Sequence, residues 1–147
     1  MLSHLQPRFK KFLIVIFVLA GLGLVDALYL SVQHYTGEVP PCTLTGGCEK
    51  VTTSEYSKIF GIPVAYMGAL YYLGLLAVLI FFVDLKRREL FLFATGIVSF
   101  GFIFSIYLTY LQFFVINALC PYCLLSALTS SILAVLLWFC TLKKLFH

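Results

Sequence analysis

The strongest constraint in this chain is a set of four apolar stretches, each long enough to cross a lipid bilayer as a helix. They run over about 12–30, 62–83, 90–115 and 120–142. A spanning helix needs about 20 mainly apolar residues, because each residue adds about 1.5 Å along a bilayer core about 30 Å thick. With 62% hydrophobic and 11% charged residues, the chain lacks the polar surface of a water-soluble protein. The sequence therefore predicts an all-α integral membrane protein.

Short basic segments predict how these helices are oriented. Basic residues lie at 8–11, 86–88 and 143–144, and the alternation of the four stretches places all three segments on one side. Basic loops stay in the cytoplasm, so both termini are expected there. Links at 84–89 and 116–119 allow only tight antiparallel hairpins, whereas 31–61 forms one long outer loop. We expect an antiparallel four-helix bundle that forms one domain over 1–147, with no fused thioredoxin-like domain. The first stretch is expected to stay uncleaved, because no small-x-small cleavage site follows it.

The five cysteines divide between the two sides of this predicted topology. Cys42 and Cys48 lie in the outer loop, and Cys120 and Cys123 lie at the outer end of the fourth stretch. Cys140 comes about 20 residues later, about 30 Å away along a helix, and is expected to be an inert apolar residue. Four cysteines therefore share the compartment in which disulfides persist.

The segment Cys120-Pro121-Tyr122-Cys123 is the most specific chemical motif. Unpaired N–H groups and the positive dipole end at a helix start stabilise a thiolate, which is the reactive form of cysteine. Pro121 fits a first helical turn, where a missing N–H costs nothing. We expect Cys120 at the membrane surface and Cys123 about one turn deeper, where a lipid-soluble acceptor can reach it.

The loop pair, Cys42 and Cys48, is separated by five residues that include Gly46 and Gly47. Glycines make this segment pliable, and Pro40-Pro41 offers a further hinge point. A disulfide here could brace the loop, but this composition favours a mobile redox shuttle. Two dithiols in one compartment form a relay for electrons.

Three other interpretations are open at this point. Two structural disulfides could brace a small transporter or a structural membrane protein, although no charge-lined path crosses the predicted helices. Four cysteines could hold zinc or an iron–sulfur cluster, but one pair is half sunk in the bilayer, so we expect no metal. A nucleic-acid partner is not expected, since the sequence has no basic stripe.

Several motifs, in this order, resemble the vitamin K epoxide reductase family. The sequence Cys48-Glu49-Lys50-Val51 precedes a serine at 54 and a Gly-Ile-Pro-Val run at 61–64, and Tyr-Leu-Gln at 110–112 precedes the C-x-x-C motif. The resemblance covers nearly the whole chain, from the first stretch through the fourth. A lone C-x-x-C would be weak evidence, whereas the whole set in this order is specific.

The resemblance implies a four-helix bundle around a quinone, and a relay of thiol–disulfide exchange. By position, Cys42 would meet a thioredoxin-like partner, Cys48 would exchange with Cys120, and Cys123 would face the quinone. The residues at quinone-pocket positions are Ser54, Met67, Tyr71, Tyr72, Leu108 and Gln112.

Departures from the animal members narrow the expected function. Their tyrosine one turn after the C-x-x-C falls at Ala127, and their asparagine at the start of the second helix falls near Val64. The chain therefore resembles a bacterial, single-domain member that uses ubiquinone or menaquinone, in the role of the quinone-linked oxidase called disulfide-bond formation protein B. Its partner would be a separate periplasmic or extracytoplasmic dithiol protein. The site would lie on the outer side of the cytoplasmic membrane, and the activity would support disulfide-bond formation.

Asp26 is the one charged residue well inside a predicted helix. A carboxylate within a span is a functional candidate by default, and the competing interpretation is that it reaches the outer interface or pairs with a loop group. Phe113 and Phe114 are expected to face lipid or the bundle core rather than the quinone, and Tyr35, Tyr56 and Tyr122 to lie in an interfacial aromatic belt.

Overall fold

The structure is a computed structural model that describes residues 6–39, 41–42 and 46–143. The predictions made for Pro40, for 43–45 of the cysteine loop and for Lys144 lie outside these residues. Four long helices dominate the chain: α1 (Pro7–Thr36), α3 (Val64–Leu85), α4 (Arg88–Tyr110) and α5 (Pro121–Leu142). All four are long and apolar enough to cross a membrane, which confirms the predicted integral membrane protein.

Short elements join these helices. Between α1 and α3 lie helix α2 (Cys48–Thr52), the 3₁₀-helix η1 (Glu55–Ser57) and a two-stranded antiparallel hairpin of β1 (Lys58–Ile59) and β2 (Ile62–Pro63). A π-helical turn, η2 (Leu111–Ile116), continues α4. Neither α2 nor the π-turn is predicted by the sequence, because segments this short carry no hydrophobic periodicity to detect.

Local chemistry explains where the long helices begin and end. Pro7 and Pro121 occupy the first turns of α1 and α5, where proline's fixed φ suits a helix and its missing N–H costs nothing. Helix α1 is capped by Gly37, whose φ of +72° lets the last turn close through N–H bonds to the Gln33 and His34 carbonyls. Helix α1 therefore extends beyond the predicted 12–30 range at both ends, by about three turns in total.

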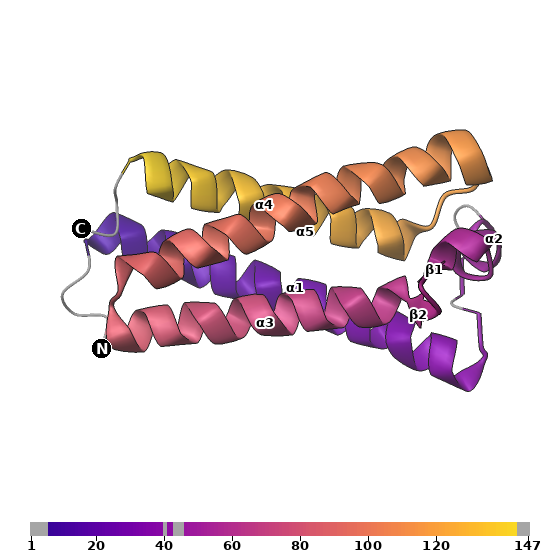
Figure 1. Cartoon of the computed structure of the whole chain (residues 1–147), viewed down its shortest axis with the longest axis horizontal. Coiled ribbons are helices and arrows are strands. Elements are labelled where there is room, and N and C mark those ends of the chain that lie inside the picture. The colour runs from indigo at the N-terminus through magenta and orange to yellow at the C-terminus, as the bar shows by residue number, and fades with distance from the viewer. Residues whose placement is uncertain (1–5, 40, 43–45, 144–147) are drawn as a thin grey trace.

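The long helices form a closed ring in which each packs against two neighbours. Helix α1 contacts α3 and α5, and α4 contacts α3 and α5. Both ends of the described chain lie at one end of the bundle, and α2 and the β-hairpin lie at the other (Figure 1). This arrangement confirms a packed bundle of four apolar helices. The side of the membrane on which the termini lie stays a prediction.

The interior is filled differently at the two ends of the bundle. At the end with the termini, a continuous apolar core includes Phe9, Phe82, Phe91 and Leu137, with edge-to-face rings such as Phe9 on Phe91 at 5.8 Å. At the other end, a smaller cluster joins α2, η2 and the start of α5. The space between these two clusters holds the cavity described below.

Two glycines of the bundle make room for tyrosine rings of α3. A Cβ on Gly23 would strike the ring of Tyr72, and one on Gly101 would lie 2.5 Å from the ring of Tyr71. These glycines therefore admit tyrosine rings rather than neighbouring backbones. At Gly21, Gly74 and Gly96, by contrast, a Cβ would meet nothing within 4 Å, so these positions do not need glycine for packing.

Outward surfaces of the helices carry large apolar side chains. Phe113 and Phe114 are 51% and 72% exposed and lie outside the central cavity. Of the two locations expected for them, the lipid-facing surface and the bundle core, their exposure favours the first, because both side chains face outward.

Candidate redox site

Cys42 and Cys48 form a disulfide with a Cα–Cα distance of 5.8 Å. Cys48 is the first residue of α2 and is fully buried, whereas Cys42 is partly exposed. A protein arriving from outside the bundle can therefore reach the sulfur of Cys42 more easily than that of Cys48.

The second pair stands at the start of α5. Cys120 is the N-cap residue, and its sulfur accepts a hydrogen bond from the backbone N–H of Cys123 at 3.3 Å. Both side chains are free thiols. Hydrogen bonding from the Cys123 side chain holds the pKa of the Cys120 thiol below its usual range, against the opposing effects of burial and of the Asp26 charge.

The π-turn that precedes this motif is hydrogen-bonded to Cys120 through Gln112. Gln112 is almost fully buried, and its Oε1 accepts a hydrogen bond of 3.0 Å from the backbone N–H of Cys120. A π-turn adds one residue to the helical repeat and often occurs at functional sites. Asn117 then reverses the chain with φ +54°. Gln112 therefore fixes the position from which α5 begins.

The two cysteine pairs meet in one buried cluster. Cys48 and Cys120 both belong to the small apolar core at this end, and Cys42 and Cys123 pack against it. Gly47 makes this meeting possible, because a Cβ there would lie 2.5 Å from the carbonyl oxygen and 2.8 Å from the nitrogen of Leu119. Gly47 and Leu119, the residues before Cys48 and Cys120, thus lie against each other.

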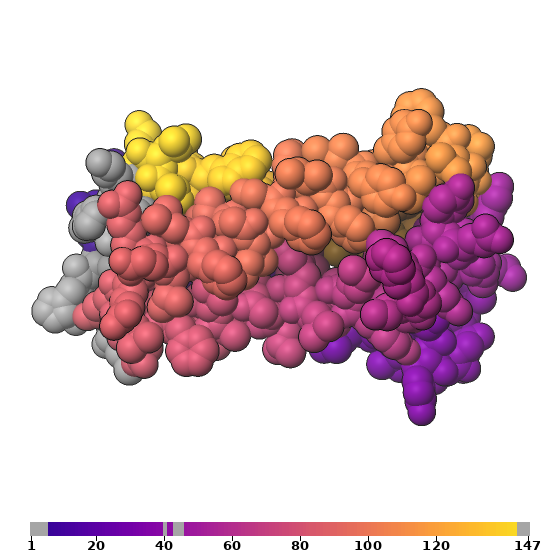
Figure 2. Space-filling view, viewed as in Figure 1, coloured from indigo at the N-terminus to yellow at the C-terminus, as the bar shows by residue number. Residues whose placement is uncertain are grey.

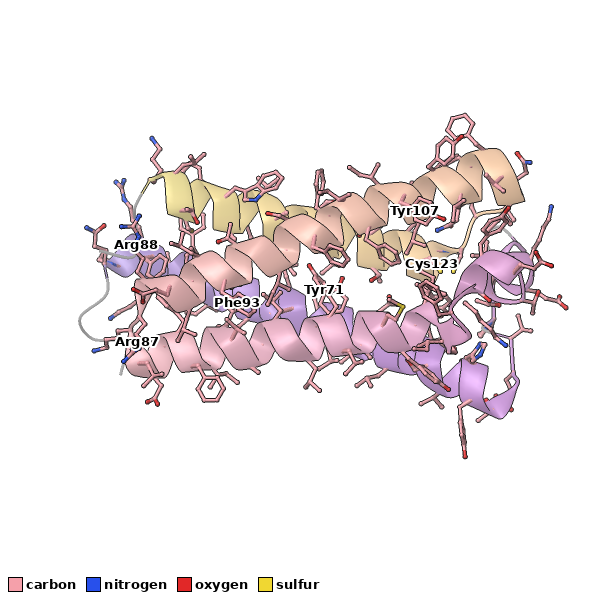
Figure 3. All side chains as sticks on the ribbon, viewed as in Figure 1. Tyr71, Arg87, Arg88, Phe93, Tyr107 and Cys123 are labelled. Atoms are coloured by element: carbon pink, nitrogen blue, oxygen red, sulfur yellow. A yellow bond between two sulfur atoms is a disulfide. The ribbon has the colours of Figure 1, made fainter. Side chains whose placement is uncertain are left out.

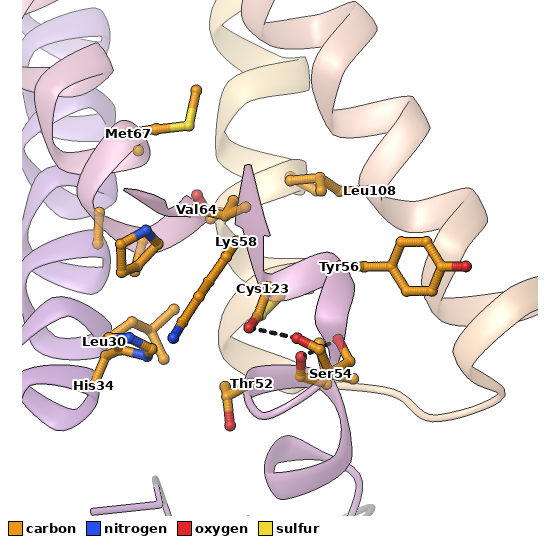
Figure 4. Close-up of a pocket in the computed structure, with 18 of the residues that line it drawn as sticks. Leu30, His34, Thr52, Ser54, Tyr56, Lys58, Val64, Met67, Leu108 and Cys123 are labelled. Carbon is orange, nitrogen blue, oxygen red and sulfur yellow. Dashed lines mark hydrogen bonds between the residues drawn. The ribbon is translucent and has the colours of Figure 1, made fainter. Parts of the chain in front are cut away.

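Beside Cys123, a cavity of about 710 Å³ opens among α1, α3, α4 and α5. All six residues predicted to bind quinone line it: Ser54, Met67, Tyr71, Tyr72, Leu108 and Gln112. Figure 4 shows Met67 and Leu108 on opposite sides of this space, with Ser54 and Cys123 nearer the end that carries α2. In the space-filling view the surface is hollowed between α4 and the start of α3 (Figure 2).

Two tyrosines of α3 close the inner end of the cavity. The Tyr72 hydroxyl donates to the carbonyl oxygen of Ser126 at 2.9 Å, and the Tyr71 hydroxyl lies 3.1 Å from Oγ of Ser130. The two rings contact each other edge to face at 4.8 Å. Figure 3 shows Tyr71 between the helices, further from the α2 end than Cys123. Both hydroxyls are thereby held to α5.

Sequence reasoning missed several polar residues around the cavity. His34, Tyr56 and Lys58 line its outer part, and Lys58 extends toward His34 in Figure 4. Spacing alone could not place Lys58, because the β-hairpin turns it back over the bundle. Ala127 also lines the cavity.

The remaining cysteine and the carboxylate of α1 occupy different surroundings. Cys140 is fully buried in the apolar core at the far end of the bundle, away from the other four cysteines. Asp26 is 8% exposed and belongs to the inward face of α1. Asp26 is therefore buried in the bundle, and a functional role for it stays a prediction. Within the described ranges, no group of three or more His, Cys, Asp or Glu side chains could hold a metal ion.

Comparison with known families agrees with this geometry. The sequence pattern of the vitamin K epoxide reductase family matches residues 14–138. That range includes both cysteine pairs and all six predicted quinone-pocket residues, and it ends before Cys140. The match and the two cysteine pairs together indicate a thiol–disulfide redox function.

Proposed function

The chain belongs to the vitamin K epoxide reductase family, and from this premise we propose that it is a quinone-linked thiol:disulfide oxidoreductase. Members of the family are oxidoreductases that use quinones. One observation carries the proposal: a buried cluster connects the Cys42–Cys48 disulfide to Cys120, and Cys123 lies on the other side, at the cavity wall. Two successive thiol–disulfide exchanges could therefore carry electrons from the loop pair through Cys120 to Cys123.

The first step of the proposed relay takes place at the outer loop. A reduced dithiol protein attacks Cys42, the more exposed sulfur of the loop disulfide. The S–S bond breaks, a mixed disulfide forms with the partner, and Cys48 leaves as a thiolate. The partner's second thiol then attacks the mixed disulfide and leaves with its own disulfide, so both loop cysteines are reduced.

The second step transfers the electron pair to α5. When Cys120 and Cys123 form a disulfide, the Cys48 thiolate attacks Cys120 and releases Cys123 at the cavity. Cys42 then attacks Cys48 and releases Cys120. A low thiol pKa makes a good leaving group, and the hydrogen bond from Cys123 lowers the pKa of Cys120. The pairing in the structure, a loop disulfide beside two free thiols in the C-x-x-C motif, is the one that this step would produce.

The cavity beside Cys123 suits a quinone in size and chemistry. Small-molecule sites enclose about 300–1,000 Å³ and combine an apolar lining with a few oriented polar groups, and this one has about 710 Å³. Met67 and Leu108 provide apolar surface, and the Tyr71 and Tyr72 hydroxyls supply polar groups at its inner end. When bound, a quinone accepts two electrons and two protons. The six predicted residues would hold it there.

We further propose where this activity takes place. The three basic segments favour a topology with both termini in the cytoplasm. In a bacterial cell, α2 and the cysteines would then face the periplasm or the exterior. The donor is a separate thioredoxin-like protein in that compartment. Once oxidised, it can introduce disulfides into secreted proteins, which is the role of the quinone-linked oxidases of disulfide-bond formation.

Steady-state quinone reduction tests this function. Purified protein in detergent receives a reduced thioredoxin-like donor and ubiquinone or menaquinone, and loss of quinone is followed by absorbance. We expect turnover by the wild type and none by Cys123→Ser, although the donor should still exchange with the loop pair. Cys140→Ala is the matched control on the same helix and should turn over normally. Quinone reduction by Cys123→Ser at the wild-type rate would show that the proposed order of transfer is wrong.

A further inference from the structure

Gln112 is a buried side chain that reaches two parts of the site. It belongs to the π-turn η2, is 3% exposed, and lines the cavity beside Cys123. Its Oε1 accepts the backbone N–H of Cys120 at 3.0 Å, and its main-chain carbonyl accepts the N–H of Ala118 at 3.2 Å. The side chain is therefore held between the start of α5 and the cavity.

The bond to Cys120 fixes the orientation of the Gln112 amide. A backbone N–H can only donate, so it must pair with the oxygen of the amide and not with its NH₂ group. That NH₂ group is left for another partner, and no described residue accepts a hydrogen bond from it. A buried amide N–H normally has an acceptor. Because Gln112 lines the cavity, a molecule bound there can supply one.

The other five predicted pocket residues offer a quinone no comparable donor. Two are apolar, and the polar three are engaged elsewhere. The Ser54 hydroxyl donates to a carbonyl of α2 at 2.8 Å, the Tyr72 hydroxyl donates to a carbonyl of α5 at 2.9 Å, and the Tyr71 hydroxyl is paired with a serine of α5 at 3.1 Å. A quinone carbonyl oxygen can only accept hydrogen bonds. Among the six residues, Gln112 is thus the one whose donor group has no partner in the described ranges.

We propose that the Gln112 amide bridges Cys120 and the quinone: its oxygen positions the Cys120 backbone, and its NH₂ group donates a hydrogen bond to one quinone carbonyl oxygen. The inference rests on the proposed function and names the group that recognises the quinone.

This bridge would link the quinone to the α5 dithiol through hydrogen bonds. The Cys120 sulfur accepts the backbone N–H of Cys123 at 3.3 Å, and the Cys120 N–H donates to Gln112. The amide therefore ties the quinone oxygen to the same backbone that carries both thiols. That oxygen gains negative charge as electrons arrive, and a donor already in place stabilises such a charge.

Infrared spectroscopy of the quinone carbonyl groups tests the bridge. Ubiquinone isotopically labelled at one carbonyl carbon or the other is added to purified protein in detergent, and the difference from the unlabelled sample isolates each C=O stretch. A hydrogen bond lowers that frequency, because it weakens the C=O bond. We expect one carbonyl to be shifted down in the wild type and this shift to vanish in Gln112→Met. Quinone binding should weaken about 3- to 10-fold, as the loss of one neutral hydrogen bond predicts.

The other two glutamines provide matched substitutions. Gln6→Met makes the same change at an exposed position before α1, at the opposite end of the bundle, and should leave the shift and the binding unchanged. Gln33→Met makes it in the last turn of α1, where Gln33 also lines the cavity. A shift lost in Gln33→Met but kept in Gln112→Met would assign the donor to α1 and overturn the inference.

Gln112→Glu separates the two roles of the amide. Glutamate has nearly the same shape, and its carboxyl oxygen can still accept the Cys120 N–H, but an ionised carboxylate has no proton to donate. The infrared band of a protonated carboxyl group shows which form is present. The ionised form should lose the carbonyl shift and keep wild-type exchange between Cys48 and Cys120, measured without quinone. A protonated form should keep both, since its O–H replaces the NH₂ group. An ionised variant that keeps the shift would contradict the bridge.

These measurements distinguish the inference from the proposed function. An unchanged shift in Gln112→Met, with a wild type that reduces quinone, would overturn the inference and leave the proposed function standing. Lower turnover in Gln112→Met with unchanged shift and binding would make Gln112 a positioning residue for Cys120 alone, and would also overturn it. A wild type that neither binds nor reduces quinone would refute the proposed function, and the inference with it.

Discussion

Replacing Gly47 with alanine tests whether close contact between the two cysteine segments sets the rate of the relay. The backbone of Gly47 has φ −90° and ψ −7°, which any residue can adopt, so the change adds a methyl group without conformational strain. That methyl would lie 2.5 Å from the Leu119 carbonyl oxygen, and reaching an ordinary contact of 3.4 Å requires a retreat of about 0.9 Å. The atoms it meets are backbone, so a side-chain rotation cannot relieve the contact.

This retreat sets the size of the expected effects. A misplacement of about 1 Å between reacting groups costs about 100-fold in rate, so exchange between Cys48 and Cys120 should slow by about that factor. Overpacking costs about 1–3 kcal/mol, and the usual gain from Gly→Ala returns about 0.4–1 kcal/mol. The folded state should therefore lose about 1–2 kcal/mol.

The assay isolates this exchange by leaving only Cys48 and Cys120. The background is Cys42→Ser, Cys123→Ser, Cys140→Ala. An aromatic disulfide reagent labels one of the two remaining thiols and releases a first aromatic thiol. The other thiol then attacks the labelled sulfur and releases a second aromatic thiol. The second release of aromatic thiol measures exchange within the molecule, and it should be about 100-fold slower with Gly47→Ala.

Two control substitutions separate the effect of the contact with Leu119 from the effect of loop flexibility. Gly74→Ala meets no atom within 4 Å and should leave the second release unchanged. Gly46→Ala also has open space but disturbs a φ of +61°, so it reports on the pliability of the loop. A wild-type second release in Gly47→Ala would refute the idea that this contact positions the exchange.

Two more perturbations test the cavity and the thiol pair. Gly23→Ala places a methyl group on the Tyr72 ring, so the thermal unfolding midpoint should fall by an amount equivalent to about 1–3 kcal/mol. A midpoint within error of the wild type would mean that the ring moves aside freely. In Cys123→Ala, Cys120 loses the hydrogen bond that most lowers its pKa, so its alkylation should require a higher pH than in the wild type. An unchanged pH dependence would show that the helix start alone sets the reactivity of Cys120.

The sequence predicted the long elements because their signals are continuous. Four apolar stretches with basic segments between them leave few arrangements, and the short links at 84–89 and 116–119 specify neighbouring antiparallel helices. The same reasoning could not find α2 or the π-turn at Leu111–Ile116, whose formation depends on contacts with the bundle. Helix α1 also continues past the apolar stretch to Thr36, since polar residues extend a helix that is already nucleated.

For the candidate site too, residues that belong to sequence motifs were predicted, whereas residues brought in by tertiary contacts were not. Motif order pointed to both cysteine pairs and to six residues that now line one cavity, although their roles as catalytic and quinone-binding residues remain predictions. Lys58 and His34 were missed, because a hairpin and a helix end bring them together over the cavity. Gly47 was predicted to supply flexibility. In the structure its missing Cβ also allows contact with Leu119, which spacing alone could not indicate.

A single-turnover experiment tests the central claim most directly. Protein with a reduced α5 pair is mixed without air with one equivalent of quinone, and both quinol and the cysteine pairing are measured, the latter by mass spectrometry of peptides. The account predicts one quinol for each new disulfide, with that disulfide between Cys120 and Cys123. Quinol formed without this disulfide, or the disulfide formed without quinol, would contradict it.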